Sequence, residues 1–203
     1  MAFVTGYVSL PTNSYWNWRA AVSGNGYDAD GQWGDQCWDL TAEFWYNIGF
    51  PPGYPQTGPN HYAAECWSVS RENNKQYGGE LYFDLIYNKE DIKQGDVIVW
   101  NGTTDYPTGH IGFADEDYNP LHPNTIAVLG QNQGSGGTPP PVVNPDGGTT
   151  ANVKTLGLES FAGAFRYKNW GPTPPTPGVS YKSHTKKFPW VLYANKLRAR
   201  NNL

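Results

Sequence analysis

The sequence has little of what marks several common classes of protein. Only two cysteines, Cys37 and Cys66, occur in 203 residues. They are too few for a disulfide framework, so either one is available as a free nucleophile. No apolar run approaches the roughly 18 residues that cross a bilayer, and the N-terminal residues lack the basic, apolar and small-residue regions of a signal peptide. We therefore expect synthesis in a cytoplasm and no membrane insertion.

Charged residues are also scarce, at 16% of the chain, whereas aromatic residues reach 15% and hydrophobic residues 38%. Disordered chains show the opposite balance, so a folded domain is expected. The length suits one domain with a short appendage. The formal net charge is −4, and an acidic body repels nucleic acid, so a nucleic-acid partner is not expected.

Basic residues are concentrated at the C-terminal end. Residues 179–203 hold six of the 14 Lys and Arg residues and no acid, which leaves 8 basic and 18 acidic residues, a net −10, in the rest. The Pro-rich stretch 169–178 predicts a stiff linker before this tail, and residues 1–168 the folded domain. A basic tail suits an anionic polymer such as teichoic acid; a merely solvated tail is the alternative.

Helical patterns precede strand patterns along the chain. Asn13 or Ser14 is expected to cap a helix that runs to Val22, and Asp35 to cap a second helix that begins near Cys37 and ends at Gly49. A further helix is possible around residues 63–70, and Gly134–Thr150 is expected to form a long surface loop. The predicted strands are Val97–Trp100, His110–Ala114, Thr125–Leu129 and Ala164–Tyr167. Helices followed by antiparallel strands predict an α+β domain.

Cys37 lies in the first turn of the second predicted helix. Unpaired backbone N–H groups and the positive end of the helix dipole favour a thiolate at such a position. A buried, inert cysteine is the alternative interpretation, and the presence of a base decides between the two.

His110 is the best placed base, because it opens a predicted strand and a strand end holds a side chain rigidly. The other histidines, in loop-like or tail sequence, are His61, His122 and His184. The strand that His110 opens and the next predicted strand could form a hairpin around Leu121. Residues whose numbers sum to 242 would then face each other, which pairs His110 with Asn132. An amide beside the second imidazole nitrogen would fix the tautomer, as in Cys-His-Asn catalysis.

These residues resemble the CHAP family of cysteine- and histidine-dependent amidohydrolases and peptidases. The matching stretches are Asp28–Leu40, with Gln36-Cys37-Trp38-Asp39-Leu40 at its end, then Gly95–Trp100, Gly109–Gly112, Gln131-Asn132 and Gly163–Arg166. The resemblance implies a papain-like fold with N-terminal helices packed on an antiparallel β-sheet. It also implies Cys37 as nucleophile, His110 as base, Asn132 as its orienter, and Gln36 with nearby N–H groups as oxyanion donors. Many members have Glu two residues before the Asn, where this chain has Gly130.

The resemblance further implies a peptidoglycan hydrolase of a phage, either an endolysin released through a holin or a virion-associated lysin, acting at the bacterial cell wall. Members cleave the N-acetylmuramoyl–L-alanine amide or a peptide bond of the stem or cross-bridge. A monomer or virion component is expected. Two alternatives stay open: a non-catalytic wall-binding or structural virion module on the same fold, and an intracellular cysteine protease or transglutaminase.

A possible metal loop precedes Cys37. The residues at positions 1, 3, 5, 7 and 12 of a twelve-residue stretch, the ligand spacing of an EF-hand loop, are Asp28, Asp30, Gln32, Gly34 and Asp39. Position 12 is Asp instead of Glu, and the glycine falls at position 4. Calcium-binding CHAP domains carry a similar Asp-x-Asp-Gly loop, so the resemblance implies a structural Ca²⁺ that holds the start of the helix. A polar turn without an ion is the alternative.

Overall fold

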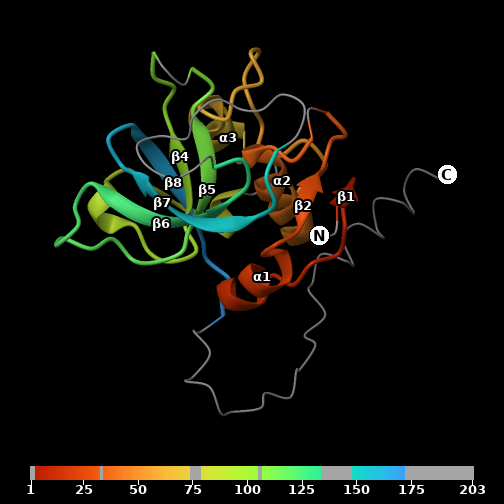
Figure 1. Cartoon of the computed structure of the whole chain (residues 1–203), viewed down its shortest axis with the longest axis horizontal. Helices are drawn as coiled ribbons and strands as arrows, with labels where there is room; N and C mark the ends of the chain where they lie inside the picture. The colour runs from red at the N-terminus through yellow and green to blue at the C-terminus, as the bar shows by residue number, and fades with distance from the viewer. Residues whose placement is uncertain (1–2, 33, 74–78, 105–106, 134–147, 172–203) are drawn as a thin grey trace, which may run out of the picture. The chain divides into compact units, whose positions relative to one another are not determined.

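The chain was analysed as a computed structural model that describes residues 3–32, 34–73, 79–104, 107–133 and 148–171 (Figure 1). These residues belong to one compact unit, residues 1–173. Most of the predicted surface loop (134–147), and the predicted linker and tail from residue 172 onward, lie outside the described residues. None of the helices within the described ranges is long and apolar enough to cross a membrane.

Four α-helices and a short 3-10 helix lie in the described ranges: α1 (Tyr15–Val22), α2 (Cys37–Ile48), α3 (Glu65–Asn73), α4 (Gly79–Tyr82) and η2 (Lys89–Asp91). The predicted cap of α1 is confirmed, because Ser14 Oγ accepts from the backbone N–H of Asn17 at 3.1 Å. The predicted end of α2 is confirmed too, with Gly49 in the left-handed conformation at φ 106°.

The N-cap predicted for α2 was wrong by one residue. Gln36, not Asp35, has extended backbone and caps the helix, and its carbonyl accepts from the Asp39 N–H at 3.2 Å. Asp39 returns the contact, because its Oδ2 accepts from the Gln36 N–H at 2.8 Å. This reciprocal pair fixes the start of α2 at Cys37.

The strands form two sheets. β1 (Phe3–Thr5) and β2 (Gly26–Asp28) make a parallel pair, and six antiparallel strands follow in the order β3-β8-β4-β5-β6-β7. Their bounds are β3 (Phe83–Ile86), β4 (Val97–Trp100), β5 (His110–Ala114), β6 (Thr125–Gly130), β7 (Asn152–Gly157) and β8 (Phe161–Tyr167). The α+β prediction and its four strands are confirmed, whereas β3 and β7 were missed.

The predicted hairpin register is also confirmed. Phe113 pairs with Leu129 and Ala114 with Val128, and each pair of numbers sums to 242. Leu121, at the turn between the strands, is 83% exposed. β6 ends at Gly130, however, so Asn132 lies beyond the strand and adopts a left-handed φ of 51°.

The sheet has a buried core on each face. One core contains the helix residues Trp18, Leu40, Phe44 and Trp45 and the sheet residues Val97, Val99, Ile111, Phe113, Leu129 and Phe165. The other contains Ile98, Trp100, Ala114, Ile126, Val128, Leu156 and Ala164. α2 packs directly on β5 in the first core (Figure 1), which brings Cys37 to the backbone at the start of β5.

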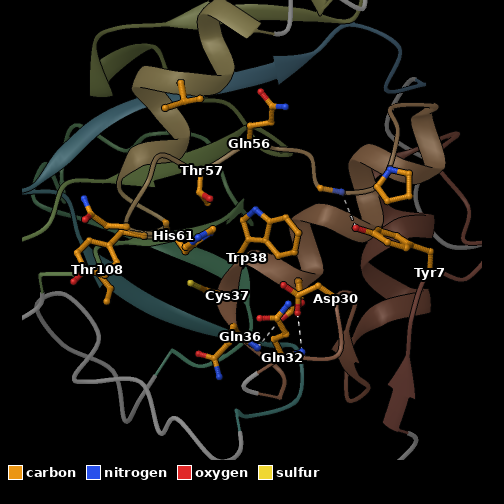
Figure 2. Close-up of a pocket in the computed structure, with 17 residues that line it drawn as sticks. Tyr7, Asp30, Gln32, Gln36, Cys37, Trp38, Gln56, Thr57, His61 and Thr108 are labelled. Atoms are coloured by element: carbon orange, nitrogen blue, oxygen red, sulfur yellow. Dashed lines mark hydrogen bonds between the residues drawn. The ribbon is translucent and has the colours of Figure 1, made fainter.

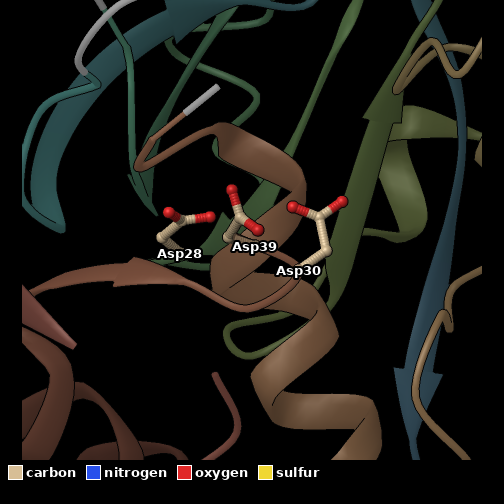
Figure 3. Close-up of side chains that lie close together, drawn as sticks. All are labelled: Asp28, Asp30 and Asp39. Atoms are coloured by element: carbon tan, nitrogen blue, oxygen red, sulfur yellow. The ribbon is translucent and has the colours of Figure 1, made fainter. Parts of the chain in front are cut away.

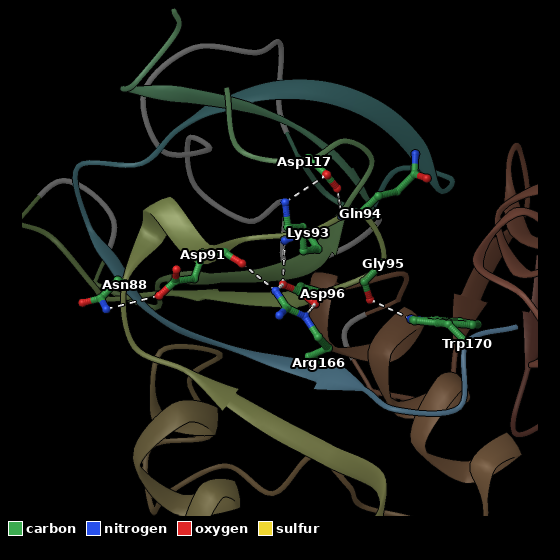
Figure 4. Close-up of polar contacts among 9 residues, drawn as sticks. All are labelled: Asn88, Asp91, Lys93, Gln94, Gly95, Asp96, Asp117, Arg166 and Trp170. Carbon is green, nitrogen blue, oxygen red and sulfur yellow. Dashed lines mark hydrogen bonds and ion pairs between the residues drawn. The ribbon is translucent and has the colours of Figure 1, made fainter. Parts of the chain in front are cut away.

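Two of the family-like motifs meet in an ion pair between β8 and the residue before β4 (Figure 4). Arg166 donates from Nε to Asp96 Oδ1 at 2.9 Å and from Nη2 to Oδ2 at 2.8 Å. The Asp96 side chain is 1% exposed. Nearby, Trp170 Nε1 donates to the Gly95 carbonyl at 3.0 Å, and the indole stacks on Phe44. The folded packing therefore includes Trp170, which the sequence places in the linker.

Candidate active site

Cys37 is the first residue of α2 and lines a cavity of about 970 Å³ (Figure 2). Its side chain is 8% exposed. The sulfur accepts a hydrogen bond from the backbone N–H of Ile111, the residue that follows His110. The predicted helix-start position is confirmed, and the thiol lies at the first peptide of β5.

The expectation that the helix start favours a thiolate was wrong for the resting protein. Burial raises the pKa of Cys37 to about 11, although the backbone N–H groups of Ile111, Trp38 and Cys37 itself lower it. Desolvation of a charged sulfur thus outweighs the helix N-terminus. The thiol carries its proton at neutral pH.

His110 is the first residue of β5 and is 1% exposed. Its ring packs on Trp100, its partner in the neighbouring strand, with ring centroids 5.5 Å apart. Burial lowers the pKa of His110 to about 4, opposed by a contact with the Gln133 side chain. The imidazole is therefore neutral at pH 7. No hydrogen bond joins the Cys37 and His110 side chains in the described part of the chain.

Asn132 contacts Gln36 instead of His110. Its Nδ2 donates to Gln36 Oε1 at 2.8 Å, and its backbone N–H donates to Thr149 Oγ1 at 3.0 Å. Among the described residues it makes no hydrogen bond to His110. The direct contact inferred from the hairpin register is absent because the chain leaves the strand after Gly130. The catalytic role of Asn132 stays a prediction.

The two amides that flank Asn132 would hold His110 in its place if the strand register were shifted by one residue, and all three amides follow directly after a strand. Gln131 is fully buried and binds both backbone groups of Tyr27, each at 2.9 Å, and the Gln36 carbonyl at 3.1 Å. It thereby ties β2 to the start of α2. Gln133 is also fully buried, and its Nε2 donates to the carbonyls of Val128, Gly130 and Asn152.

The cavity in front of Cys37 has aromatic and polar walls (Figure 2). Its lining residues include Tyr7, Asp30, Gln32, Gln36, Cys37, Trp38, Gln56, Thr57, His61, Tyr62 and Thr108. Trp38 is anchored because its Nε1 donates to the Pro55 carbonyl at 2.7 Å. Gln36 and Cys37 of the predicted site line the cavity, whereas His110 and Asn132 are not among its lining residues.

Three of the predicted metal ligands come together (Figure 3). Asp28 at the end of β2, Asp30 in the following turn and Asp39 in the first turn of α2 each offer a carboxylate oxygen, all within 4.8 Å of one another. Asp39 is 1% exposed, and its Oδ1 accepts from the Ala29 N–H at 3.0 Å. Burial, partly offset by hydrogen bonds from Gln36 and Ala29, raises the pKa of Asp39 to about 8.

The other two predicted ligands, Gln32 and Gly34, offer an amide oxygen and a backbone carbonyl and no carboxylate. Gln32 lines the cavity, and its backbone N–H donates to Asp30 Oδ1 at 2.9 Å. Gly34 has a left-handed φ of 67° and offers only a backbone carbonyl. Three carboxylates without histidine or thiolate form a hard oxygen donor set, which fits Ca²⁺ better than zinc.

The sequence profile of the CHAP domain matches residues 13–132, more than half of the 203 residues. The chain belongs to the CHAP family. A relative named "D-alanyl-L-alanine endopeptidase", from Streptococcus phage B30, is 33% identical over 124 residues, or 60% of this chain. The CHAP chain spans only 25% of the length of that curated relative.

A solved endolysin structure shares the fold. The crystal structure of the wild-type endolysin LysIME-EF1 aligns with a TM-score of 0.53 and 24% identity, over 78% of this chain and 66% of that chain. The crystal structure of Ly7917 aligns with a TM-score of 0.48 and 16% identity, over 77% and 62% of the two chains. The alignment with the endolysin confirms the predicted CHAP fold of helices on an antiparallel sheet.

Proposed function

We propose that this CHAP protein is a peptidoglycan hydrolase that cuts an amide bond with Cys37 as nucleophile and His110 as base. The observation that carries the proposal is the placement of Cys37, at the start of α2, in a large cavity and against the first peptide of β5. Membership of the CHAP family supports it. The phage B30 relative, named an endopeptidase for a D-alanyl-L-alanine bond, favours a peptide of the wall as substrate.

The reaction follows from the two neutral groups. His110 takes the thiol proton while the sulfur attacks the carbonyl carbon, because neither group is charged at rest. The tetrahedral oxyanion is held by N–H donors at the start of α2 and by the side-chain amide of Gln36. His110 then protonates the leaving amine, which departs and leaves a thioester. Water, deprotonated by His110, hydrolyses the thioester and releases the acid and the thiol.

The carboxylate cluster supports a second proposal, a structural Ca²⁺ held by Asp28, Asp30 and Asp39. Gln32 and the Gly34 carbonyl are the additional ligands that the sequence suggests. The three clustered carboxylates would repel one another without a cation. Since Asp39 also accepts a hydrogen bond from the Gln36 N–H, a bound ion would hold the residue before the nucleophile. The ion has no place in the chemical steps.

The setting of the reaction is proposed from the family. The enzyme would act at the bacterial cell wall as a phage endolysin or virion-associated lysin. The basic segment 179–203 would add affinity for an anionic wall polymer. We propose a monomer or a virion component.

Digestion of purified sacculi tests the function. Soluble fragments should appear with the wild-type chain and not with Cys37→Ser, and mass spectrometry of the new N-termini should identify an amidase or an endopeptidase. Casein should remain intact. Tight binding to sacculi without any new terminus would support the non-catalytic wall-binding module, and cleavage of casein alone would support a protein-directed cysteine protease.

A further inference from the structure

The orientation of the Gln133 amide is fixed by its surroundings. Its Nε2 donates to the carbonyls of Val128 at 3.0 Å, Gly130 at 3.2 Å and Asn152 at 2.7 Å. Turning the amide over would place a carbonyl oxygen against three others, so the nitrogen and oxygen cannot be exchanged. Oε1 must therefore point away from these carbonyls. It is buried, and no group in the described part of the structure meets the distance and angle criteria for a hydrogen bond to it.

His110 has the complementary deficiency. Its Nε2 is buried, and no described residue meets the distance and angle criteria for a hydrogen bond to it. A neutral imidazole carries one proton, which can sit on either nitrogen. A buried polar atom without a partner has lost the hydrogen bond that it makes in water, so two such atoms side by side are stabilised by bonding to each other.

A pair of glycines brings these two atoms together. An ideal Cβ on Gly112 would lie 3.7 Å from His110 Nε2, and one on Gly130 would lie 3.1 Å from Gln133 Oε1. One further step in the β5-β6 register places Gly112 opposite Gly130, and opposed residues share a face of a sheet. The imidazole and the amide thus occupy neighbouring space that side chains at the two glycines would fill.

The electrostatics agree with this geometry. Burial lowers the pKa of His110 to about 4, and the Gln133 side chain is the group that raises it. An amide oxygen has this effect when it accepts a ring N–H.

We propose that Gln133 is the positioning residue for His110: its Oε1 accepts the Nε2–H, so that Nδ1 carries the free lone pair that the proposed general base requires. Asn132, which the predicted strand register pairs with His110, donates to Gln36 instead. The catalytic part of this inference rests on the proposed function. The tautomer does not, because it is a property of the resting protein.

NMR of ¹⁵N-histidine-labelled wild-type protein tests the tautomer without any variant of Gln133. The His110 signals are those lost in His110→Ala, and one-bond and long-range ¹H–¹⁵N couplings show which nitrogen carries hydrogen. We expect Nε2–H near neutral pH. A dominant Nδ1–H form would overturn the proposal, whether or not the protein digests sacculi.

Variants test the consequence for catalysis. Gln133→Ala should lower kcat by roughly 10- to 1,000-fold with little change in KM, as for a group that acts in the transition state. The control is Asn47→Ala, which removes an amide with a comparable set of bonds to Val8, Leu10 and Glu43. The control should lower stability and keep kcat.

Rescue separates positioning from structural support. The Gly130 backbone is outside the left-handed region, so a side chain there is obstructed mainly by Gln133, whose Cδ lies 3.0 Å from the ideal Cβ. Gly130→Glu alone should lower kcat. In the Gln133→Ala background, Gly130→Glu supplies a carboxylate near the imidazole. The double variant should have a higher kcat than Gln133→Ala and a higher pKa of His110.

Unchanged kcat in folded Gln133→Ala, or no rescue in the folded double variant, would overturn the proposal. If Gln133→Ala fails to fold, the tautomer of the wild type decides. If the wild type itself leaves sacculi intact, the proposed function fails, while the tautomer measurement still tests the contact between Gln133 and His110.

Discussion

Asn132 and Gln36, 96 residues apart in the chain, are joined by a hydrogen bond of 2.8 Å from Nδ2 to Oε1. The bond connects the loop after β6 to the N-cap of α2, directly before the nucleophile. It orients the side-chain amide that we assign to the oxyanion. Asn132 therefore influences the site from the side of Gln36.

The two residues should act as one unit. Asn132→Ala and Gln36→Ala should each lower kcat by roughly 10- to 1,000-fold with little change in KM, and the double variant should be little worse than either. A double-variant loss equal to the product of the single losses would contradict the coupling. Rates of release of soluble wall fragments provide the measurement.

Asn132→Asp distinguishes the two roles considered for Asn132. A carboxylate can accept an imidazole N–H, but it cannot donate to Gln36 Oε1. The Asp variant should therefore be nearly as impaired as the Ala variant. Near-normal rate in Asn132→Asp would instead restore the role predicted from the hairpin register.

The sequence could predict the parts of the site that depend on periodicity. The apolar spacing after Cys37 and the Gly49 stop define α2, and an assumed hairpin centred on Leu121 has the β5-β6 register that the structure shows. Asn132 could not be placed, because the register ends at Gly130 and the chain then turns into a left-handed conformation. The sequence could not decide between Gln133 and Asn132 as the residue beside His110, since the Gln133 side chain folds back beside a glycine and contacts groups that no sequence pattern connects.

Calcium should raise thermal stability. An ion that binds only the folded state stabilises it by RT ln(1 + [L]/Kd), about 2.7 kcal/mol at a hundredfold excess over Kd. Melting curves in EDTA and in calcium should differ for the wild type and coincide for Asp28→Ala. Asp117→Asn, which removes an exposed carboxylate outside the cluster, is the matched control and should keep the shift. Identical curves for the wild type with and without calcium would refute the metal site.

The second cysteine provides a control for the nucleophile. Cys66 is fully buried, and its Sγ lies 4.0 Å from the Pro55 carbonyl, so a serine hydroxyl there has an acceptor. Cys66→Ser should retain most of the wall-degrading activity, whereas Cys37→Ser should lose it with the fold intact by circular dichroism. Equal losses in two folded variants would remove Cys37 from its assigned role.

Glu43 should make stability depend on pH. Burial raises the pKa of Glu43 to about 7 from an ordinary value of 4.5, although the Val8 N–H lowers it. The unfolded chain therefore loses this proton first, and the free energy of unfolding should fall as pH rises from about 4.5 to 7, by up to about 3 kcal/mol. Glu43→Gln keeps an acceptor for Val8 and should be more stable than the wild type at pH 8. Denaturant unfolding at pH 4 and pH 8 measures the difference, which should nearly vanish at pH 4.

The burial of Cys37 also bears on how the protein survives oxidants. Peroxide attacks the thiolate form of cysteine, and a pKa of about 11 leaves roughly one thiol in ten thousand ionised at pH 7. With 8% of its side chain exposed, the sulfur also offers a peroxide little surface. Oxidation to sulfenic acid should be slow in air, so the resting protein should store well without added reductant.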